Sequence, residues 1–215
     1  MRFYADSADV ERVEALLRAG LVSGVTSNPA ILDRADRGAG DFPELYSRYV
    51  AAGAEEVFFQ TWGSSPSEMV ANASRITDLG DRVVVKLTAT RAGFSAAAVL
   101  RRAGVPTLIT AVNTVAQAAM SAQVGAAWIA PYFGQIADRT GEPPVGLVGA
   151  MHAALRDSPT QVLLASVRNP QAVEQALAVG IRAFTAHPDV LDACQTDEHS
   201  ERAHATFEDL VLRRA

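Results

Sequence analysis

Hydrophobic and polar positions along the chain follow two alternating periods. Short runs of β-branched and bulky residues, bounded by polar residues or glycine, have the pattern of strands that are covered on both faces of a parallel sheet. Eight such runs are expected to be strands: Arg2–Ala5, Leu21–Thr26, Glu56–Thr61, Arg82–Leu87, Thr107–Ala111, Ala127–Pro131, Gln161–Ala165 and Arg182–Thr185.

Between these runs, apolar residues recur at intervals of three and four, which predicts amphipathic helices. The stretch after Ser7 places its apolar residues on one helix face. Another helix is predicted over Pro66–Leu79, because Ser65 and Pro66 form a cap and first-turn pair. The same spacing predicts helices over Gly93–Ala103, Asn113–Val124, Val145–Leu155 and Pro170–Val179.

Strands that alternate with helices indicate a parallel sheet. Such a sheet can stay open and doubly wound or close into a (β/α)₈ TIM barrel, and a count of eight strands favours the barrel. No linker or low-complexity segment divides the sequence, so we expect a single α/β domain over residues 1–215. The helical spacing of Asp197–Arg214 predicts an additional C-terminal helix, which packs either on its own barrel or on a neighbouring subunit.

Acidic and basic residues are mixed along the chain and give a formal net charge of −5. This distribution lacks the basic stripe of a nucleic-acid-binding protein. The N-terminus does not have the pattern of a signal peptide, and the apolar region Val105–Phe133 is interrupted by polar residues. The one cysteine, Cys194, cannot form an internal disulfide and is expected to be a small buried hydrophobic residue. We therefore expect a soluble cytoplasmic protein that binds neither nucleic acid nor membranes.

Lys86 interrupts an apolar run, VVVKLTA, that has the pattern of a buried strand. Burial of an ammonium group is unfavourable unless the group is paired. A nearby carboxylate could hold Lys86 in a structural ion pair. Alternatively, desolvation could favour the neutral amine, which is nucleophilic and can form an imine with a carbonyl group. The run alone leaves both interpretations open.

Polar residues mark the ends of the predicted strands. In barrel enzymes the reacting groups lie at the carboxyl ends of the strands. An amine, a carboxylate, a phenol and several amide and hydroxyl groups at one mouth would supply a nucleophile, proton transfer and hydrogen bonds for a polyhydroxylated substrate. The set lacks the ligands of a catalytic metal, so no metal is expected. Its members are Asp6, Thr26, Asn28, Gln60, Lys86, Thr88, Thr110, Tyr132, Ser166 and Arg168.

A few other residues resemble candidate sites but have simpler interpretations. His187 lies just past the eighth predicted strand and is expected to be a loop histidine bonded to the backbone. Glu198, His199, Glu201 and His204 spread around a predicted helix, so we expect a solvated face rather than a metal site.

Seven segments stand in order along the chain and carry a family resemblance. They are FYADSAD (Phe3–Asp9), GVTSNPAI (Gly24–Ile31), VFFQ (Val57–Gln60), VVVKLTAT (Val83–Thr90), PTLITAV (Pro106–Val112), WIAPYFGQIAD (Trp128–Asp138) and LLASVRNP (Leu163–Pro170). Their order and spacing resemble the transaldolase family, in particular its short branch, which includes fructose-6-phosphate aldolase. The resemblance implies a (β/α)₈ barrel in which Lys86 forms a covalent Schiff base and no other cofactor is used.

The resemblance also implies roles for residues near the lysine. Asp6 matches an aspartate that assists proton transfers at the lysine. Thr26 and Asn28 match residues that contact the substrate hydroxyls and the surroundings of the lysine.

A further set of matches concerns the catalytic water. Gln60 and Thr110 match the pair that positions this water, and Tyr132 matches a tyrosine that donates and accepts protons in the aldolase branch. In the transaldolases proper, a glutamate typically occupies the position of Gln60 and a phenylalanine that of Tyr132. The resemblance therefore implies a preference for direct cleavage over transfer.

The implied phosphate site departs from the family pattern. The family uses an arginine shortly after strand 6, together with a serine and a cation after strand 7. Ser166 and Arg168 match the second pair, whereas Gln135 stands where the first arginine is expected. A neutral amide cannot replace the charge-assisted hydrogen bonds of a guanidinium. We therefore expect weaker phosphate binding, a contribution from Arg139, or a different acceptor.

Taken with the resemblance, these residues predict a class I transaldolase or fructose-6-phosphate aldolase-like enzyme of carbohydrate metabolism, including that of pentose phosphates. Its expected substrates are sugar phosphates or small ketoses and aldehydes, and a ring-like homo-oligomer is implied. One alternative is a catalytically silent barrel that binds a sugar phosphate. Another is a class I aldolase with a different donor, such as a deoxyribose-phosphate type, against which the GVTSNP segment argues.

Overall fold

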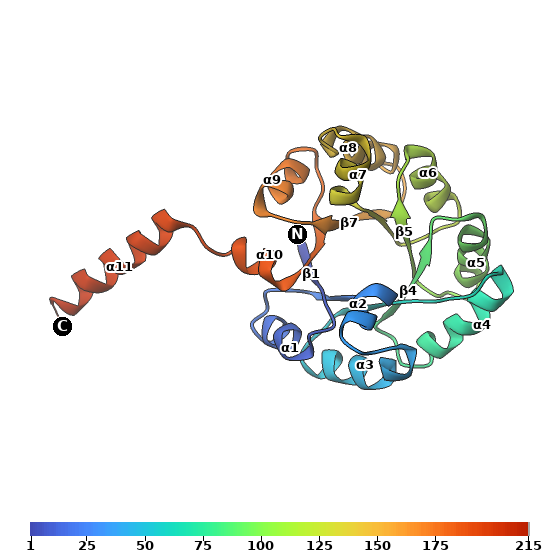
Figure 1. Cartoon of the computed structure of the whole chain (residues 1–215), viewed down its shortest axis with the longest axis horizontal. Helices are drawn as coiled ribbons and strands as arrows, with labels where there is room; N and C mark the ends of the chain where they lie inside the picture. The colour runs from blue at the N-terminus through green and yellow to red at the C-terminus, as the bar shows by residue number, and fades with distance from the viewer. Residues whose placement is uncertain (215) are drawn as a thin grey trace.

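The computed structural model describes residues 1–214, and within them eight parallel strands form a closed barrel. Helices surround the strands and give the ring seen in Figure 1. Strand β1 pairs with β2 on one side and with β8 on the other, so the open sheet is excluded and the predicted (β/α)₈ barrel is confirmed. The strands are β1 (Arg2–Asp6), β2 (Gly24–Thr26), β3 (Glu56–Gln60), β4 (Val83–Thr88), β5 (Thr107–Val112), β6 (Trp128–Pro131), β7 (Gln161–Val167) and β8 (Ala183–Ala186).

Side chains cap the first turns of many helices. Asp9, Ser65 and Thr90 each accept a hydrogen bond from the backbone N–H three residues later, which satisfies a donor that the helix itself leaves unpaired. Among the described residues, no helix has the length and apolar composition needed to span a bilayer. The helices are α1 (Val10–Arg18), α2 (Pro29–Arg34), the 3₁₀ helix η1 (Ala39–Asp41), α3 (Phe42–Ala51), α4 (Pro66–Thr77), α5 (Arg91–Arg102), α6 (Val115–Gln123), α7 (Phe133–Thr140), α8 (Val145–Ala154), α9 (Pro170–Ala178), α10 (Pro188–Ala193) and α11 (Glu198–Leu212).

The observed elements differ from the predicted ones mainly where they are short. Strand β2 begins at Gly24 rather than at Leu21, because the chain is still turning out of α1 and Gly20 has a positive φ of +69°. The sequence pattern does not predict α2, α3, α7 or α10. Helices α2 and α10 have only six residues each, which is less than two turns and too few to show a period.

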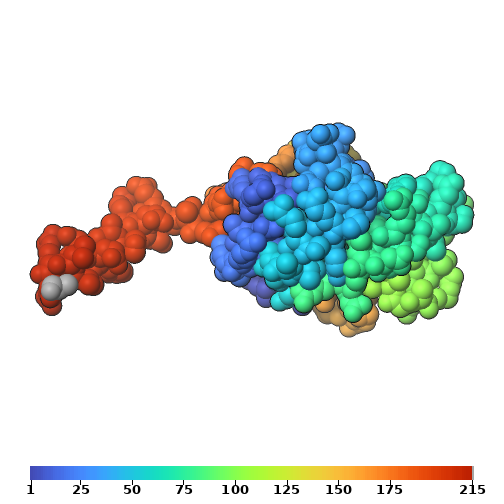
Figure 2. Space-filling view, turned by 90° about the horizontal axis from the view of Figure 1, so that it is seen from below, coloured from blue at the N-terminus to red at the C-terminus, as the bar shows by residue number. Residues whose placement is uncertain are grey.

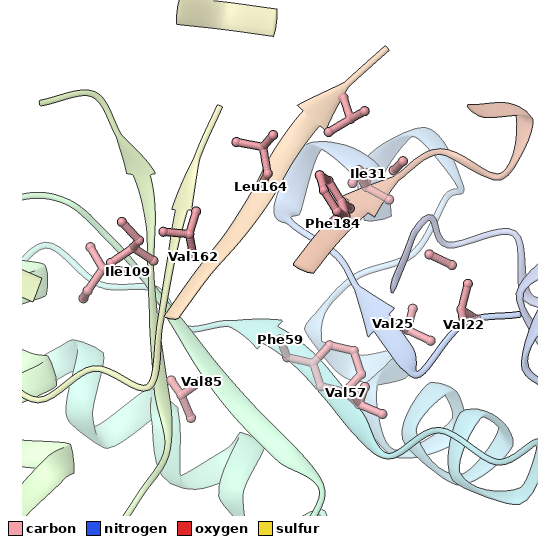
Figure 3. Packing of buried hydrophobic residues seen from close by; sticks show 14 of the residues in the cluster. Val22, Val25, Ile31, Val57, Phe59, Val85, Ile109, Val162, Leu164 and Phe184 are labelled. Carbon is pink, nitrogen blue, oxygen red and sulfur yellow. The ribbon is translucent and has the colours of Figure 1, made fainter. Parts of the chain in front are cut away.

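Successive residues of each strand face opposite sides of the barrel wall. Val57, Phe59, Val85 and Ile109 belong to the outer layer, where the strands pack against the surrounding helices (Figure 3). The residues between them point into the barrel and form a separate inner cluster. This alternation decides which strand residues can reach a site inside the barrel.

Aromatic residues close the interior near the amino ends of the strands. The rings of Tyr4, Phe58 and Trp128 meet edge to face, with centroids 5.4, 6.2 and 6.4 Å apart. Below them the Glu56 carboxylate accepts hydrogen bonds from the Tyr4 hydroxyl, from Trp128 Nε1 (3.2 Å) and from Arg2 (3.0 Å). The inner cluster is therefore a packed floor.

Helix α11 projects away from the barrel, as Figures 1 and 2 show. Within residues 198–212 no side chain is buried, and Phe207, Leu210 and Val211 are 63%, 51% and 63% exposed. The alternative that this helix packs on its own barrel is therefore wrong, and packing on a neighbouring subunit stays a prediction. The expectation of a buried Cys194 is also wrong, because this residue lies exposed where α10 ends and the chain leaves the barrel.

Candidate active site

A pocket of about 480 Å³ opens at the carboxyl ends of the strands. The alternation along each strand creates it, because the residue two positions beyond a floor residue also points inward, one layer higher. Asp6 follows Tyr4 in this way, and Lys86 follows Val84. The polar residues that line the pocket are Asp6, Thr26, Asn28, Arg34, Gln60, Lys86, Thr88, Thr110, Tyr132, Gln135, Ser166 and Thr185.

Lys86 is 4% exposed, and its Nζ donates a hydrogen bond of 2.6 Å to the carbonyl oxygen of Ser27. Within residues 1–214 no carboxylate lies within 4.0 Å of this nitrogen, so the structural ion pair considered for Lys86 is not formed. Burial lowers the pKa of Lys86 from its usual value, and the negative charge of Asp6 acts in the opposite direction. The neutral amine is therefore favoured more than in an exposed lysine, and it is the form that attacks a carbonyl carbon.

A chain of hydroxyl groups holds the Asp6 carboxylate in place. The Thr26 hydroxyl donates to Asp6 Oδ1 at 2.6 Å and lies 2.6 Å from the Thr185 hydroxyl. A hydroxyl has one proton to donate, so Thr185 must be the donor to Thr26. The carboxylate oxygens remain acceptors, and Asp6 can take or return a proton beside the lysine.

Tyr132 forms the opposite part of the polar layer with Thr110, whose hydroxyl donates to the Tyr132 hydroxyl at 2.8 Å. Because Tyr132 accepts this bond, its own proton is free to point into the pocket. Burial raises the pKa of Tyr132, the Thr110 bond lowers it, and the charge of Asp6 raises it. The net direction is upward, so the phenol keeps its proton at neutral pH and can act as an acid. Gln60, at the end of β3, lies beside Lys86 in the strand register.

Two non-glycine residues in the pocket wall have left-handed backbone conformations. Ala111 has φ +56° and Ser166 has φ +57°, and both line the pocket. Each lies at a shift in strand register, between Thr110 and Val112 in one case and between Leu164 and Val167 in the other. Bulges of this kind bend a strand and redirect side chains, and they occur often beside active sites.

The sequence model of the family described as Transaldolase/Fructose-6-phosphate aldolase matches residues 3–213. The chain belongs to this family. It is accordingly a transaldolase-type enzyme with a transaldolase-like aldolase function.

Curated relatives of this chain are named as probable transaldolases, in agreement with the family's description. A probable transaldolase of Streptococcus equi subsp. equi (strain 4047) is 32% identical over 199 residues, which cover 92% of this chain and 91% of that one. A probable transaldolase of Maridesulfovibrio salexigens is 29% identical over 209 residues, or 96% of each chain. The resemblance inferred from the seven sequence segments is thus confirmed.

Solved structures outside the transaldolase family share the barrel. A thiamine phosphate pyrophosphorylase from Pyrococcus furiosus gives a TM-score of 0.63 at 11% identity, covering 90% of this chain and 93% of that one. Mandelate oxidase gives a TM-score of 0.60 at 16% identity, and this chain spans 65% of its length. At such identities the likeness shows the fold alone.

The pocket of this transaldolase-family enzyme brings together most of the site residues predicted from the sequence. The Oδ1 atom of Asn28 also caps α2, where it accepts from the Ile31 N–H at 3.0 Å. The roles that the resemblance assigns to these residues stay predictions. The predicted residues that line the pocket are Asp6, Thr26, Asn28, Gln60, Lys86, Thr88, Thr110, Tyr132, Gln135 and Ser166.

Two predicted arginines lie outside the pocket. The guanidinium of Arg168 makes a bidentate pair with Asp138 on α7, at 2.9 and 2.5 Å, and Arg168 does not line the pocket. Arg139 is exposed on α7 and does not line it either. Neither guanidinium is therefore placed to contact a molecule bound in the pocket as the structure stands.

Sequence reasoning missed three groups that complete the pocket of this transaldolase-type enzyme. The carbonyl oxygen of Ser27 is the acceptor for Lys86, and a backbone acceptor leaves no mark in the sequence. Thr185 could have been found, because it lies two residues beyond the inward-facing Ala183. Arg34 lies in the last turn of α2, a helix too short to be recognised from its pattern.

The simpler interpretations of the remaining candidates can be examined in the structure. His187 Nδ1 accepts from the backbone N–H of Asp189 at 3.3 Å and caps α10, so the backbone-bonded interpretation is confirmed. The side chains of residues 198, 199, 201 and 204 are exposed on α11. Across residues 1–214, no three His, Cys, Asp or Glu side chains are grouped so that they could hold a metal ion.

Proposed function

We propose that this enzyme forms a Schiff base between Lys86 and a ketose phosphate, cleaves it, and holds the resulting three-carbon unit as a dihydroxyacetone enamine. The observation that carries the proposal is the buried Lys86, whose pKa is lowered and which lies in a pocket of hydroxyl, amide and carboxylate groups. The location of this lysine on the inner face of β4, one layer above the apolar floor, supports the same role.

Imine formation begins when the lone pair of Lys86 Nζ attacks the C2 carbonyl carbon of the ketose. The carbonyl oxygen takes a proton, the nitrogen loses one, and the hydroxyl then leaves as water after a second protonation. Asp6 is the group that relays these protons, since its carboxylate is held beside the lysine by Thr26. The product is an iminium, which attracts electrons from the adjacent bonds.

Cleavage breaks the bond between C3 and C4 of the sugar. A base takes the proton of the C4 hydroxyl, the aldehyde leaves, and the electron pair of the broken bond moves into the iminium to form the enamine. We assign the base to a water molecule bound by Gln60, Thr110 and Tyr132. These three residues line one pocket, and the Tyr132 proton is directed by the Thr110 bond.

The enamine then has two outcomes. Its carbon can attack the carbonyl carbon of an acceptor aldehyde, and hydrolysis of the new iminium by water then frees the ketose product and completes transfer. Alternatively, the enamine carbon takes a proton, and hydrolysis of the resulting iminium releases dihydroxyacetone. Both outcomes use the same lysine and need no metal or organic cofactor, because the iminium itself accepts the electron pair. The Tyr132 hydroxyl, which accepts from Thr110 and keeps its own proton free for the pocket, supports a proton donor there and hence release as well as transfer.

We further propose that the enzyme is a cytoplasmic homo-oligomer, ring-like in arrangement, in which α11 packs on a neighbouring copy. Support comes from Phe207, Leu210 and Val211, which would otherwise expose apolar surface on a helix that contacts no barrel wall of its own. The single cysteine fits a reducing compartment.

Borohydride trapping tests the imine directly. Lys86 is the only lysine in the sequence, so a reduced adduct of dihydroxyacetone or fructose 6-phosphate on a lysine can lie at one position. We expect one adduct per chain by intact mass and its location at Lys86 by peptide mapping. Lys86→Arg should fold normally, form no adduct and lose turnover, because arginine does not deprotonate to attack a carbonyl.

The same measurement separates the proposal from its alternatives. Binding of fructose 6-phosphate without any adduct would mean a silent sugar-phosphate barrel. An adduct that survives in Lys86→Arg would place the reaction at the N-terminal amine and contradict the role of Lys86. An adduct that forms with acetaldehyde but with no ketose would indicate a class I aldolase with a different donor, as in the deoxyribose-phosphate type.

A further inference from the structure

The cations inside the pocket are few. Of the lining residues in the described part of the chain, Lys86 and Arg34 are the two with basic side chains. Lys86 is occupied by the proposed imine, and burial favours its neutral form. If the proposed function holds, a sugar phosphate enters this pocket with its anionic group, and Arg34 is the side chain left to meet it.

The opposite wall offers no positive charge. Gln135, on α7, lines the pocket with a neutral amide. The neighbouring Arg168 is neutralised by its bidentate pair with Asp138, and that pair lies outside the pocket. Arg168 would have to leave this pair, in which both side chains are more than half exposed, to reach the pocket.

Arg34 is held in a suitable position by the helix that carries it. Asn28 caps α2, while Ile31 and Leu32 are buried and anchor its next turn. Ala30, Ile31 and Arg34 are separated by the spacings that share one helix face, and all three line the pocket. Arg34 therefore stands at the rim on a helix fixed directly to the end of β2.

The guanidinium of Arg34 is also available. Within residues 1–214 no carboxylate lies within 4.0 Å of it, although the nearby Arg37 is paired with Asp41 and Glu44. An arginine without a carboxylate partner can offer two parallel N–H donors to one phosphate group. The carboxylate that lines the pocket, Asp6, accepts a hydrogen bond from Thr26.

We propose that Arg34 is the phosphate-binding residue of this enzyme and sets its preference for phosphorylated sugars. The phosphate then lies at the α2 rim, on the side of the barrel formed by β2, and not against α7. This arrangement would compensate for Gln135 by a cation on a different wall. It would also orient the sugar across the pocket, with its carbonyl carbon at Lys86.

The test compares a phosphorylated and an unphosphorylated sugar. We expect Arg34→Ala to raise KM for fructose 6-phosphate by about ten- to hundredfold, with a much smaller change for fructose. Arg34→Lys should recover part of the difference, because it keeps the charge but loses the bidentate geometry. Inorganic phosphate should compete with fructose 6-phosphate in the unaltered enzyme and lose that effect in Arg34→Ala.

Arg139→Ala is the matched control, since Arg139 is an exposed arginine that does not line the pocket. It should leave both sugars unaffected. The proposal is overturned if Arg34→Ala changes KM equally for both sugars or for neither. It is also overturned if Arg139→Ala, rather than Arg34→Ala, shows the selective loss.

Trapping of dihydroxyacetone separates a failure of this proposal from a failure of the proposed function. Dihydroxyacetone has no phosphate, so Arg34→Ala should be trapped by borohydride as well as the unaltered enzyme. Normal trapping together with an unchanged phosphate preference would refute the role of Arg34 alone. Absence of trapping in the unaltered enzyme would refute the imine chemistry, whatever Arg34 does.

Discussion

The ammonium form of Lys86 is disfavoured where it lies, because burial on the inner face of β4 separates it from water. The unfolded chain keeps the proton up to the usual lysine range, near pH 10.4, whereas the folded chain gives it up at a lower pH. In that interval the unfolded state binds more protons, so the free energy of unfolding rises with pH. The buried amine of Lys86 therefore lowers the free energy of unfolding at neutral pH.

Lys86→Met should accordingly be more stable than the unaltered enzyme at pH 7. Each tenfold loss of proton affinity corresponds to about 1.4 kcal/mol. The advantage should shrink as the pH is raised toward 10.4, because the lysine of the unfolded chain then also loses its proton and folding no longer requires deprotonation. Urea unfolding at several pH values measures the difference in the free energy of unfolding between the two proteins. A methionine variant that is less stable at every pH would mean that Lys86 stays charged and is stabilised by Asp6.

Tyr132 controls the balance between release and transfer if it is the acid of the pocket. Tyr132→Phe removes the hydroxyl that accepts from Thr110 and carries the free proton. Release of dihydroxyacetone from fructose 6-phosphate alone should fall by about a hundredfold, the usual scale of general acid catalysis, while transfer to an added aldehyde falls less. Tyr46→Phe, on α3 and away from the pocket, is the control. Equal losses in both reactions would assign Tyr132 another role.

At the level of elements, the period of the sequence predicted the helices of nine residues or more except α3, which has ten. The strands around Lys86 and Thr110 were predicted within a residue or two, because a continuous apolar run is hard to mistake. Helix α2 was not, since six residues span less than two turns. The positive φ angles of Ala111 and Ser166 could not be predicted either, because neither residue type favours that conformation.

The candidate site also contains residues that the sequence pattern predicts and residues that it misses. Asp6, Lys86 and Tyr132 could be predicted because strand alternation and strand order alone bring them to one mouth. The state of Arg168 depends on a pair with Asp138, thirty positions away, whose geometry no local pattern contains. Arg34 was missed because it lies on α2, which is too short to be recognised from its sequence pattern.

The exposed helix α11 leads to a prediction about subunit assembly. Its exposed apolar residues should hold subunits together, so Phe207→Asp combined with Leu210→Asp should lower the mass of the assembly in light scattering. Glu208→Gln, on the same helix, should leave the mass unchanged. No residue of α11 lines the pocket, so the imine should still be trapped in the dissociated variant. An unchanged mass in the double variant would contradict the proposed contact.

For the molecule as a whole, the closed barrel determines where chemistry can occur. Strand ends that are distant along the chain, such as Asp6 and Thr185, become neighbours because β1 pairs with β8. Asp6, Gln60, Lys86 and Thr110 each stand one inward-facing layer above an apolar residue of the floor, and the helices pack against the outer face of the strands. The pocket is thus built on the buried, hydrogen-bonded strands of the closed barrel.

The packed floor has a kinetic consequence. Tyr4, Phe58 and Leu108 are 0% exposed, so molecules cannot pass through the barrel and must use the mouth beside Arg34 and Gln135. In the proposed mechanism, the aldehyde product and the acceptor aldehyde therefore use the same mouth and occupy the same space above Lys86. The proposed mechanism then predicts that the acceptor binds only after the first product has left, so that the enzyme alternates between a free form and an enamine-bound form in a ping-pong cycle. A high concentration of the acceptor aldehyde or of the aldehyde product should then inhibit the reaction by competing for this space.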